Sequence, residues 1–360
     1  MTLKKYLINI NYIQINLLNI IMSNDKINES DLFMKYKSSY KLAFIDMTTH
    51  IFLLSIGFYL LYIFKNSWVN ILPIIFVGLL HVKTFIIFHD CCHNSYTPNK
   101  NLNYIISHIT GIFIFTSPNW ILDHNTHHLS NGNYENKYKY KFNELIEYTE
   151  NQFLKLPKIK RNIFILLYNY KVYFTLFPFL YFFLVQRYVY IFKKIKYGNK
   201  IIYPLITIIF NHIINNIGII IYIYTISYYH NIVQCLFSLY IACIIGFILF
   251  HNQHTFNPSF VINNDEWTQK NSGLLGSSFL QIPKYLKYFT GGIEYHHIHH
   301  INAKIPGYNL KKYHDEVILK SHIFDDVVKL SWKDCLNNLK LRLYSESSCK
   351  YIRIDEIKNK

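Results

Sequence analysis

The sequence predicts an all-α integral membrane protein, with about four transmembrane helices in two hairpins, further interfacial helices and a cytosolic cap rich in histidine. Three observations predict this fold class. Long apolar runs recur along the 360 residues, of which 51% are hydrophobic. Basic residues lie beside the ends of those runs, and two groups of histidines begin directly where an apolar run ends.

The apolar runs are the primary signal for the membrane helices. A helix needs about 20 residues to cross the hydrocarbon core of a bilayer. Five runs approach or exceed that length, at residues 50–64, 71–88, 163–185, 201–226 and 232–250. The third run contains Lys171 and Pro178 and follows a basic cluster, so we expect an interfacial or re-entrant helix there. Residues 102–118 are too short for a predicted span, and the other four runs form the two hairpins.

The charge pattern predicts the orientation and argues against nucleic acid as a partner. The formal net charge is +16, but Lys and Arg gather near the apolar runs and form no stripe on a recognition module. Basic flanks mark the cytosolic side of a membrane protein. If the basic N-terminal stretch is cytosolic, each hairpin returns to the cytosol and places His89 and His251 on that face. The identity of the membrane stays open.

Most of the eighteen histidines fall into four short groups. The groups are HDCCH (His89, His93), HNTHH (His124, His127, His128), HNQH (His251, His254) and HHIHH (His296, His297, His299, His300). Spacings of three and four residues place side chains on one helical face. Neutral imidazole is the commonest protein ligand for transition metals, and one structural zinc takes four ligands. So many histidines therefore predict two metal ions, and an all-imidazole site with open positions favours iron that activates oxygen.

The segments that carry these histidines resemble the membrane fatty acid desaturases, especially the delta-12/omega-6 type of bacteria and plastids. The resemblance extends over roughly Tyr40 to Leu310 and includes three histidine boxes, H-x-x-x-H, H-x-x-H-H and H-x-x-H-H, the last within TGGIEYHHIHH. It implies that the catalytic and iron-binding residues are His89, His93, His124, His127, His128, His254, His296, His299 and His300. His251 has no clear counterpart in the family, His297 is a candidate to support the ligands, and the roles of both stay open. Asp90 and Glu294 adjoin the ligands and are candidates to orient imidazole N–H groups.

The resemblance also implies a reaction and its partners. Two iron ions and O2 would insert a cis double bond into a fatty acyl chain linked to lipid, coenzyme A or a carrier protein. A separate donor, a ferredoxin or a b-type cytochrome, would supply the electrons. We expect an apolar tunnel for the acyl chain, with Trp120 and Trp267 as candidate neighbours.

Two alternatives to a desaturase remain open at this point. A hydroxylase, conjugase or ketolase could be built on the same site. A membrane metal transporter or metal-binding protein also uses histidines, although transporters place their ligands near the middle of the bilayer. For domain organisation we expect an N-terminal extension at 1–40 that is poorly ordered, a membrane domain with the di-iron site at 41–310 and a cytosolic C-terminal segment at 311–360.

Overall fold

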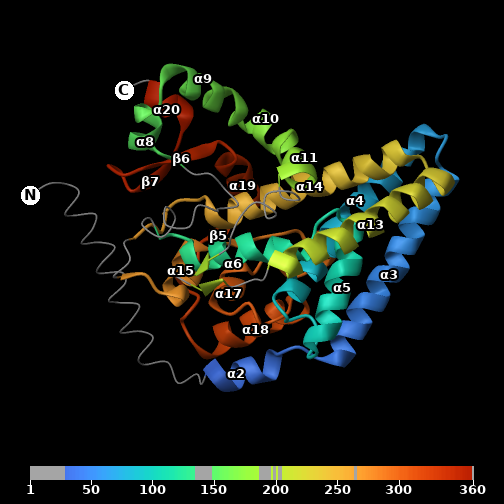
Figure 1. Cartoon of the computed structure of the whole chain (residues 1–360). Helices are drawn as coiled ribbons and strands as arrows, with labels where there is room; N and C mark the ends of the chain where they lie inside the picture. The colour runs from blue at the N-terminus through green and yellow to red at the C-terminus, as the bar shows by residue number, and fades with distance from the viewer. Residues whose placement is uncertain are drawn as a thin grey trace, which may run out of the picture.

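The chain folds into a bundle of long helices that carries a cap of shorter elements at one end (Figure 1). The computed structural model describes residues 29–133, 148–185, 196–197, 200–201, 205–262 and 266–358. Helices dominate these residues, and strands are few and short. The predicted fold class, an all-α membrane protein, is confirmed.

Among the described residues, four helices are long and apolar enough to cross a membrane. They are α3 (Tyr40–Ile63), α4 (Ile71–Cys92, preceded by the 3-10 turn Trp68–Asn70), α13 (Leu205–Tyr229) and α14 (Ile232–His254). The turns of both hairpins lie at the same end of the bundle, opposite the cap (Figure 1). Both α4 and α14 continue beyond their apolar runs, so His89 and His254 lie in the last turns of these two helices.

Helix α4 is the centre of the bundle. It packs against α3, α5 and α14, and 67% of its apolar window is buried, against 17–28% for the other three helices. Its crossing with α14 is close because Gly78 has no side chain. A Cβ at that position would lie 3.0 Å from both Ile241 Cγ2 and the Ser238 carbonyl oxygen. Small residues allow membrane helices to approach each other in this way.

The segment between the two hairpins turns sharply and does not form a straight span. Helix α5 (Lys100–Phe113) is followed by the 3-10 turn Pro118–Trp120 and α6 (Ile121–Ser130), and the two parts are bent by 105°. Asparagines of α13 hold the bend: Asn211 Nδ2 donates to Asn119 Oδ1 over 2.9 Å, and Asn215 Nδ2 donates to the Thr116 carbonyl over 3.2 Å. The bend brings the second histidine box to the end of α4, where His124 lies beside His89.

The apolar run at 163–185 is broken into short pieces. These are α9 (Lys158–Leu167), α10 (Tyr170–Thr175), α11 (Phe177–Leu180) and the π-helical turn Tyr181–Val185. Pro178, which has no backbone N–H to donate, lies in the first turn of α11. The described residues of this run therefore form no single long helix, and its interfacial or re-entrant position stays a prediction.

Short helices and strands build the cap around the ends of α4 and α14. The helical elements are α8 (Glu150–Lys155), α15 (Gln269–Gly276), the 3-10 turn Lys284–Leu286, α16 (Lys287–Thr290), α17 (His296–Ile301), α18 (Gly307–Lys320), α19 (Trp332–Asn338) and α20 (Ile354–Lys358). The strands are β1 (Tyr148–Thr149), β2 (Lys196–Tyr197), β3 (Lys200–Ile201), β4 (Phe279–Leu280), β5 (Lys329–Leu330), β6 (Leu341–Ser345) and β7 (Lys350–Arg353). Strand β6 pairs parallel with β1 and antiparallel with β7, β4 pairs parallel with β5, and β2 pairs antiparallel with β3. The pairings of β1 with β6 and of β4 with β5 join the C-terminal part to the rest of the cap.

Part of the expected N-terminal extension is built into the cap. Helix α2 (Glu29–Tyr36) lies along α18, where Leu32 is buried against Leu310 and Tyr313. The side chains of Lys35 and Tyr36 both bond the carboxylate of Glu316. Residues 1–28 of that extension lie outside the described residues.

The close crossing of α4 and α14 can be tested with Gly78→Leu. The added side chain has to displace Ile241 or the backbone at Ser238, so we expect a loss of about 1–3 kcal/mol in stability. Thermal unfolding of the purified protein in detergent should show a lower midpoint than the wild-type protein. An unchanged midpoint would contradict the close packing at Gly78.

Candidate metal centre

The structure brings the predicted histidines together in two buried clusters. Within each cluster one nitrogen from every ring lies within 4.8 Å of the others. The first cluster consists of His89, His93, His124 and His299, and the second of His127, His254, His296 and His300. Helix α4 contributes only to the first and α14 only to the second, whereas α6 and α17 contribute to both. The spacing of the histidines in the sequence does not reveal this division, because the second and third boxes each contribute histidines to both clusters.

Hydrogen bonds fix which nitrogen of two rings faces the cluster. His89 Nδ1 donates to Asp90 Oδ1 over 3.0 Å, and His254 Nδ1 donates to the Gly276 carbonyl over 3.2 Å. In a neutral imidazole the other nitrogen then carries a lone pair and no proton. In both rings this nitrogen is Nε2, and it points at the other rings of the cluster.

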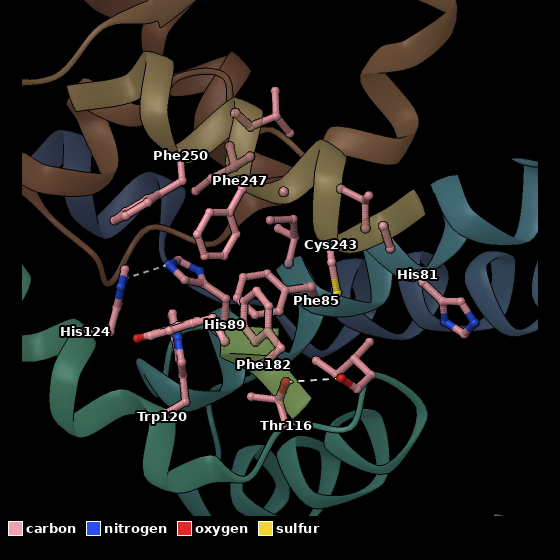
Figure 2. A pocket seen from close by; sticks show the side chains of 18 of the residues that line it. His81, Phe85, His89, Thr116, Trp120, His124, Phe182, Cys243, Phe247 and Phe250 are labelled. Atoms are coloured by element: carbon pink, nitrogen blue, oxygen red, sulfur yellow. Dashed lines mark hydrogen bonds between the residues drawn. The ribbon is translucent and has the colours of Figure 1, made fainter. Parts of the chain in front are cut away.

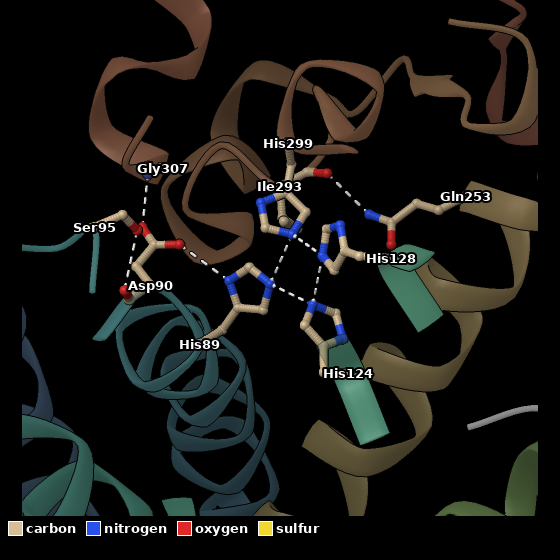
Figure 3. Close-up of polar contacts among 9 residues, drawn as sticks. All are labelled: His89, Asp90, Ser95, His124, His128, Gln253, Ile293, His299 and Gly307. Carbon is tan, nitrogen blue, oxygen red and sulfur yellow. Dashed lines mark hydrogen bonds and ion pairs between the residues drawn. The ribbon is translucent and has the colours of Figure 1, made fainter. Parts of the chain in front are cut away.

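The Nε2 atoms approach one another closely. His89 Nε2 lies 3.1 Å from the Nε2 atoms of both His124 and His299 (Figure 3). In the second cluster His254 Nε2 lies 2.9 Å from His127 Nε2 and 2.8 Å from His296 Nε2. With metal–imidazole bonds of about 2.0–2.1 Å, neighbouring ligands of one ion lie about 3 Å apart. The separations therefore match two sets of metal ligands.

Two orphaned nitrogens and the protonation states support the same assignment. His93 Nε2 and His300 Nε2 are buried without a hydrogen-bond partner, one in each cluster. Burial holds the pKa of His299 and of His300 well below the usual range, so both rings are neutral. Neutral rings with converging lone pairs fit a metal ion and repel one another without one.

His128 lies between the two clusters. Its Nε2 is 3.1 Å from His124 Nε2 and 2.9 Å from His299 Nε2, both in the first cluster. Its ring also stacks on His300 of the second cluster, with 4.3 Å between centroids. All nine predicted ligands thus lie at one site.

Asp90 joins the first box to the third. One carboxylate oxygen accepts from His89, and the other accepts from the backbone N–H of Gly307 over 2.7 Å (Figure 3). Gly292 makes this contact possible because its φ is +91° and a Cβ there would lie 2.2 Å from the Gly307 carbonyl oxygen. The other candidate, Glu294, accepts from Thr290 Oγ1 over 2.6 Å, and burial raises its pKa.

His251 and His297 have other partners. His251 Nε2 donates to the Asn338 carbonyl over 2.8 Å, and the buried guanidinium of Arg342 lies 3.4 Å from the ring. His297 Nε2 lies 3.2 Å from His314 Nδ1 on α18. Arg342 has no signal in the sequence, because its role depends on β6 folding back against α14.

An apolar cavity with a free volume of about 110 Å³ adjoins the clusters. His89, His124 and His296 form part of its wall, and Phe85, Phe247 and Phe250 surround it (Figure 2). Trp120 also lines the cavity and stacks on His124 at 4.2 Å between centroids, whereas Trp267 donates its indole N–H to the Asn131 carbonyl. The cavity thus provides apolar space directly beside the histidine clusters.

Two histidines of the third box, one inside the clusters and one outside them, allow a matched test. His300→Ala should lower the metal content of the purified protein from about two ions per chain to about one, because it removes a ligand of the second cluster. His297→Ala should retain both ions, since His297 contacts His314 instead. Elemental analysis by mass spectrometry measures the content. Equal contents in the two variants would contradict the assignment.

Asp90→Asn tests the orienting carboxylate. An amide cannot accept from both His89 and Gly307 in the present geometry, so one of the two bonds is lost. We expect metal affinity to fall about 10–100-fold, measured by competition with a chelator. Asp315→Asn, which removes an exposed carboxylate paired with Lys311, is the control. Similar affinities in the two variants would show that Asp90 does not hold His89.

Comparison with known proteins agrees with this geometry. The family model "Fatty acid desaturase" matches residues 66–322, which include every predicted ligand. A protein named fatty acid desaturase from Bacillus subtilis (strain 168) is 29% identical over 294 residues, which are 80% of this chain and 78% of that protein.

Two further relatives match over a shorter part. A protein named sn-1 acyl-lipid omega-3 desaturase (ferredoxin) from Synechocystis sp. (strain ATCC 27184 / PCC 6803 / Kazusa) is 31% identical over 118 residues, which are 30% of this chain and 33% of that protein. A protein of the same name from Nostoc sp. (strain 36) is 29% identical over 115 residues, which are 31% of this chain and 30% of that protein. Because the family model covers more than half of the chain, the chain belongs to the fatty acid desaturase family and is an oxygen-dependent oxidoreductase of the membrane.

Proposed function

We propose that the chain inserts a cis double bond into a fatty acyl chain held beside two iron ions, with delta-12/omega-6-like regiospecificity. One observation carries the proposal: two clusters of buried histidines lie at the ends of membrane helices, and His89, His124 and His296 of these clusters form part of the wall of an apolar cavity. The position of the clusters at the helix ends, away from the middle of the spans, favours an enzyme over a transporter.

The donor set favours iron among the redox metals, because all the clustered ligands are imidazoles. Two iron ions there would supply the oxidation of an unactivated –CH2–CH2– group by O2. The overall reaction adds two external electrons and two protons and gives –CH=CH– and two water molecules. The side chains supply position and a dry environment for that chemistry.

The residues of the chain have distinct tasks in this proposal. Trp120 and Phe250 line the cavity and would position an acyl chain beside the clusters, while their rings also pack on His124 and His127. Asp90 holds His89 in the tautomer whose Nε2 can bind metal. The apolar lining of the cavity excludes water from the reacting methylene groups.

The proposal also includes an orientation and a donor. We place the histidine end of the bundle in the cytosol, because the basic residues Lys35, Lys37 and Lys41 lie beside the start of α3 and the cluster from Lys155 to Arg161 is in the cap. A separate ferredoxin or b-type cytochrome would deliver electrons on that side. The name "ferredoxin" in two relatives supports the first of these.

The regiospecificity, which is the position of the new double bond, is the most detailed part of the proposal. The sequence TGGIEYHHIHH supports the delta-12/omega-6 assignment through its resemblance to that group of desaturases. The two relatives named omega-3 desaturases match only about a third of their own lengths. The position of the new double bond therefore has to be measured.

The test is the fatty-acid profile of a microbial host that expresses the chain together with a ferredoxin and its reductase. We expect a new unsaturated fatty acid that is absent with His299→Ala and present with His322→Ala. His322 is the control because its side chain is 78% exposed and lies outside the clusters. Derivatisation and mass spectrometry locate the double bond. Hydroxylated or keto products would indicate the oxygenase alternative. Metal uptake by vesicles without any modified lipid would indicate the transport alternative.

A further inference from the structure

The cavity extends from the metal clusters into the membrane part of the bundle. His89 and His124 lie at one end of it and His81 at the other (Figure 2). His81 precedes His89 by eight residues on α4, which corresponds to about 12 Å of helix. On the α14 side the lining continues past Phe247 and Gly246 to Leu239. The deep end is therefore a largely apolar space between two membrane helices, with His81 as a polar side chain in its wall.

Three of the four glycines in the spanning helices have a packing reason. A Cβ at Gly57 would lie 2.7 Å from Val77 of α4, one at Gly78 would lie 3.0 Å from Ile241 of α14, and one at Gly218 would lie 2.3 Å from Ile112 of α5. Each of these positions needs glycine because another helix passes close to it. Glycine in a helix interior otherwise costs about 1 kcal/mol relative to alanine.

Gly246 is the exception among these four. A Cβ at this position would meet nothing within 4 Å, so helix packing does not require glycine there. Gly246 lines the cavity, eight residues or about 12 Å before His254 on α14. This is the same spacing that separates His81 from His89 on the opposite wall. The missing side chain leaves open the part of the cavity between the phenylalanines near the clusters and the deep end.

We propose that Gly246 determines how long a segment of acyl chain fits into the cavity beyond the metal clusters. This inference rests on the proposed function. Because the deep lining is largely apolar and lies between membrane helices, it accommodates the methyl end of the chain, while the polar linkage remains outside. A larger side chain at 246 would then limit the number of carbons between the methyl end and the reacting bond.

The test replaces Gly246 with Ala, Val and Leu in the full-length, iron-loaded protein. In the expression host, the products of Gly246→Leu should have fewer carbons between the new double bond and the methyl end than wild-type products, either through shorter chains or through a shifted bond. Gly246→Ala should give an intermediate profile. Val233→Leu enlarges a 68% exposed side chain on the outer surface of the same helix and should leave the profile unchanged.

A binding measurement separates this inference from the proposed reaction. Saturated fatty acids of increasing length should raise the unfolding temperature of the wild-type protein progressively, and in Gly246→Leu the gain should stop at a shorter chain. This readout holds even if the wild-type protein forms no new unsaturated product, which would count against the proposed function alone. If Gly246→Leu does not fold, Gly246→Ala is read in the same way.

Two outcomes would overturn the inference. The first is an unchanged product profile and an unchanged dependence on chain length in Gly246→Leu at wild-type iron content. The second is loss of folding and iron in Gly246→Ala, because that result would assign Gly246 to packing.

Discussion

The structure depends on an electrostatic constraint at its centre. Imidazole nitrogens of buried rings converge to separations of 2.8–3.1 Å in both clusters. Such an arrangement is unfavourable unless a cation lies among the nitrogens. The helices that provide these rings must therefore be held in place by contacts outside the clusters, and much of the cap supplies such contacts.

Three sets of contacts hold the ligand-bearing helices. The α13 asparagines fix the bend that positions α6, through amides that bond the loop before it. Asp90 ties the end of α4 to the start of α18, and the glycines at 291 and 292 allow the turn before α17 to approach. Arg342 lies buried over the rings of Tyr173 and Phe174 and beside His251, one turn before His254 on α14. The C-terminal strands thus support the second cluster although they carry none of its ligands.

The sequence predicted the spans, and it singled out the histidines that the structure brings together, because both have strong local signals. Apolar runs of sufficient length predict helices, and histidines spaced by three or four residues predict ligands on one face. The division of the ligands into two clusters could not be predicted, since it depends on how α6 and α17 cross between α4 and α14. The small sheet of β1, β6 and β7 was missed because its strands are two to five residues long and pair across the chain. Asn211 and Asn215 could have been noticed in the sequence, because amide side chains are unusual within an apolar run. The many asparagines elsewhere in the chain made them less conspicuous.

Anomalous scattering of iron-loaded crystals at the iron absorption edge tests most directly whether the two histidine clusters bind two iron ions. We expect two peaks per chain, one among His89, His93, His124 and His299 and the other among His127, His254, His296 and His300. A single peak, or iron bound away from these rings, would contradict it.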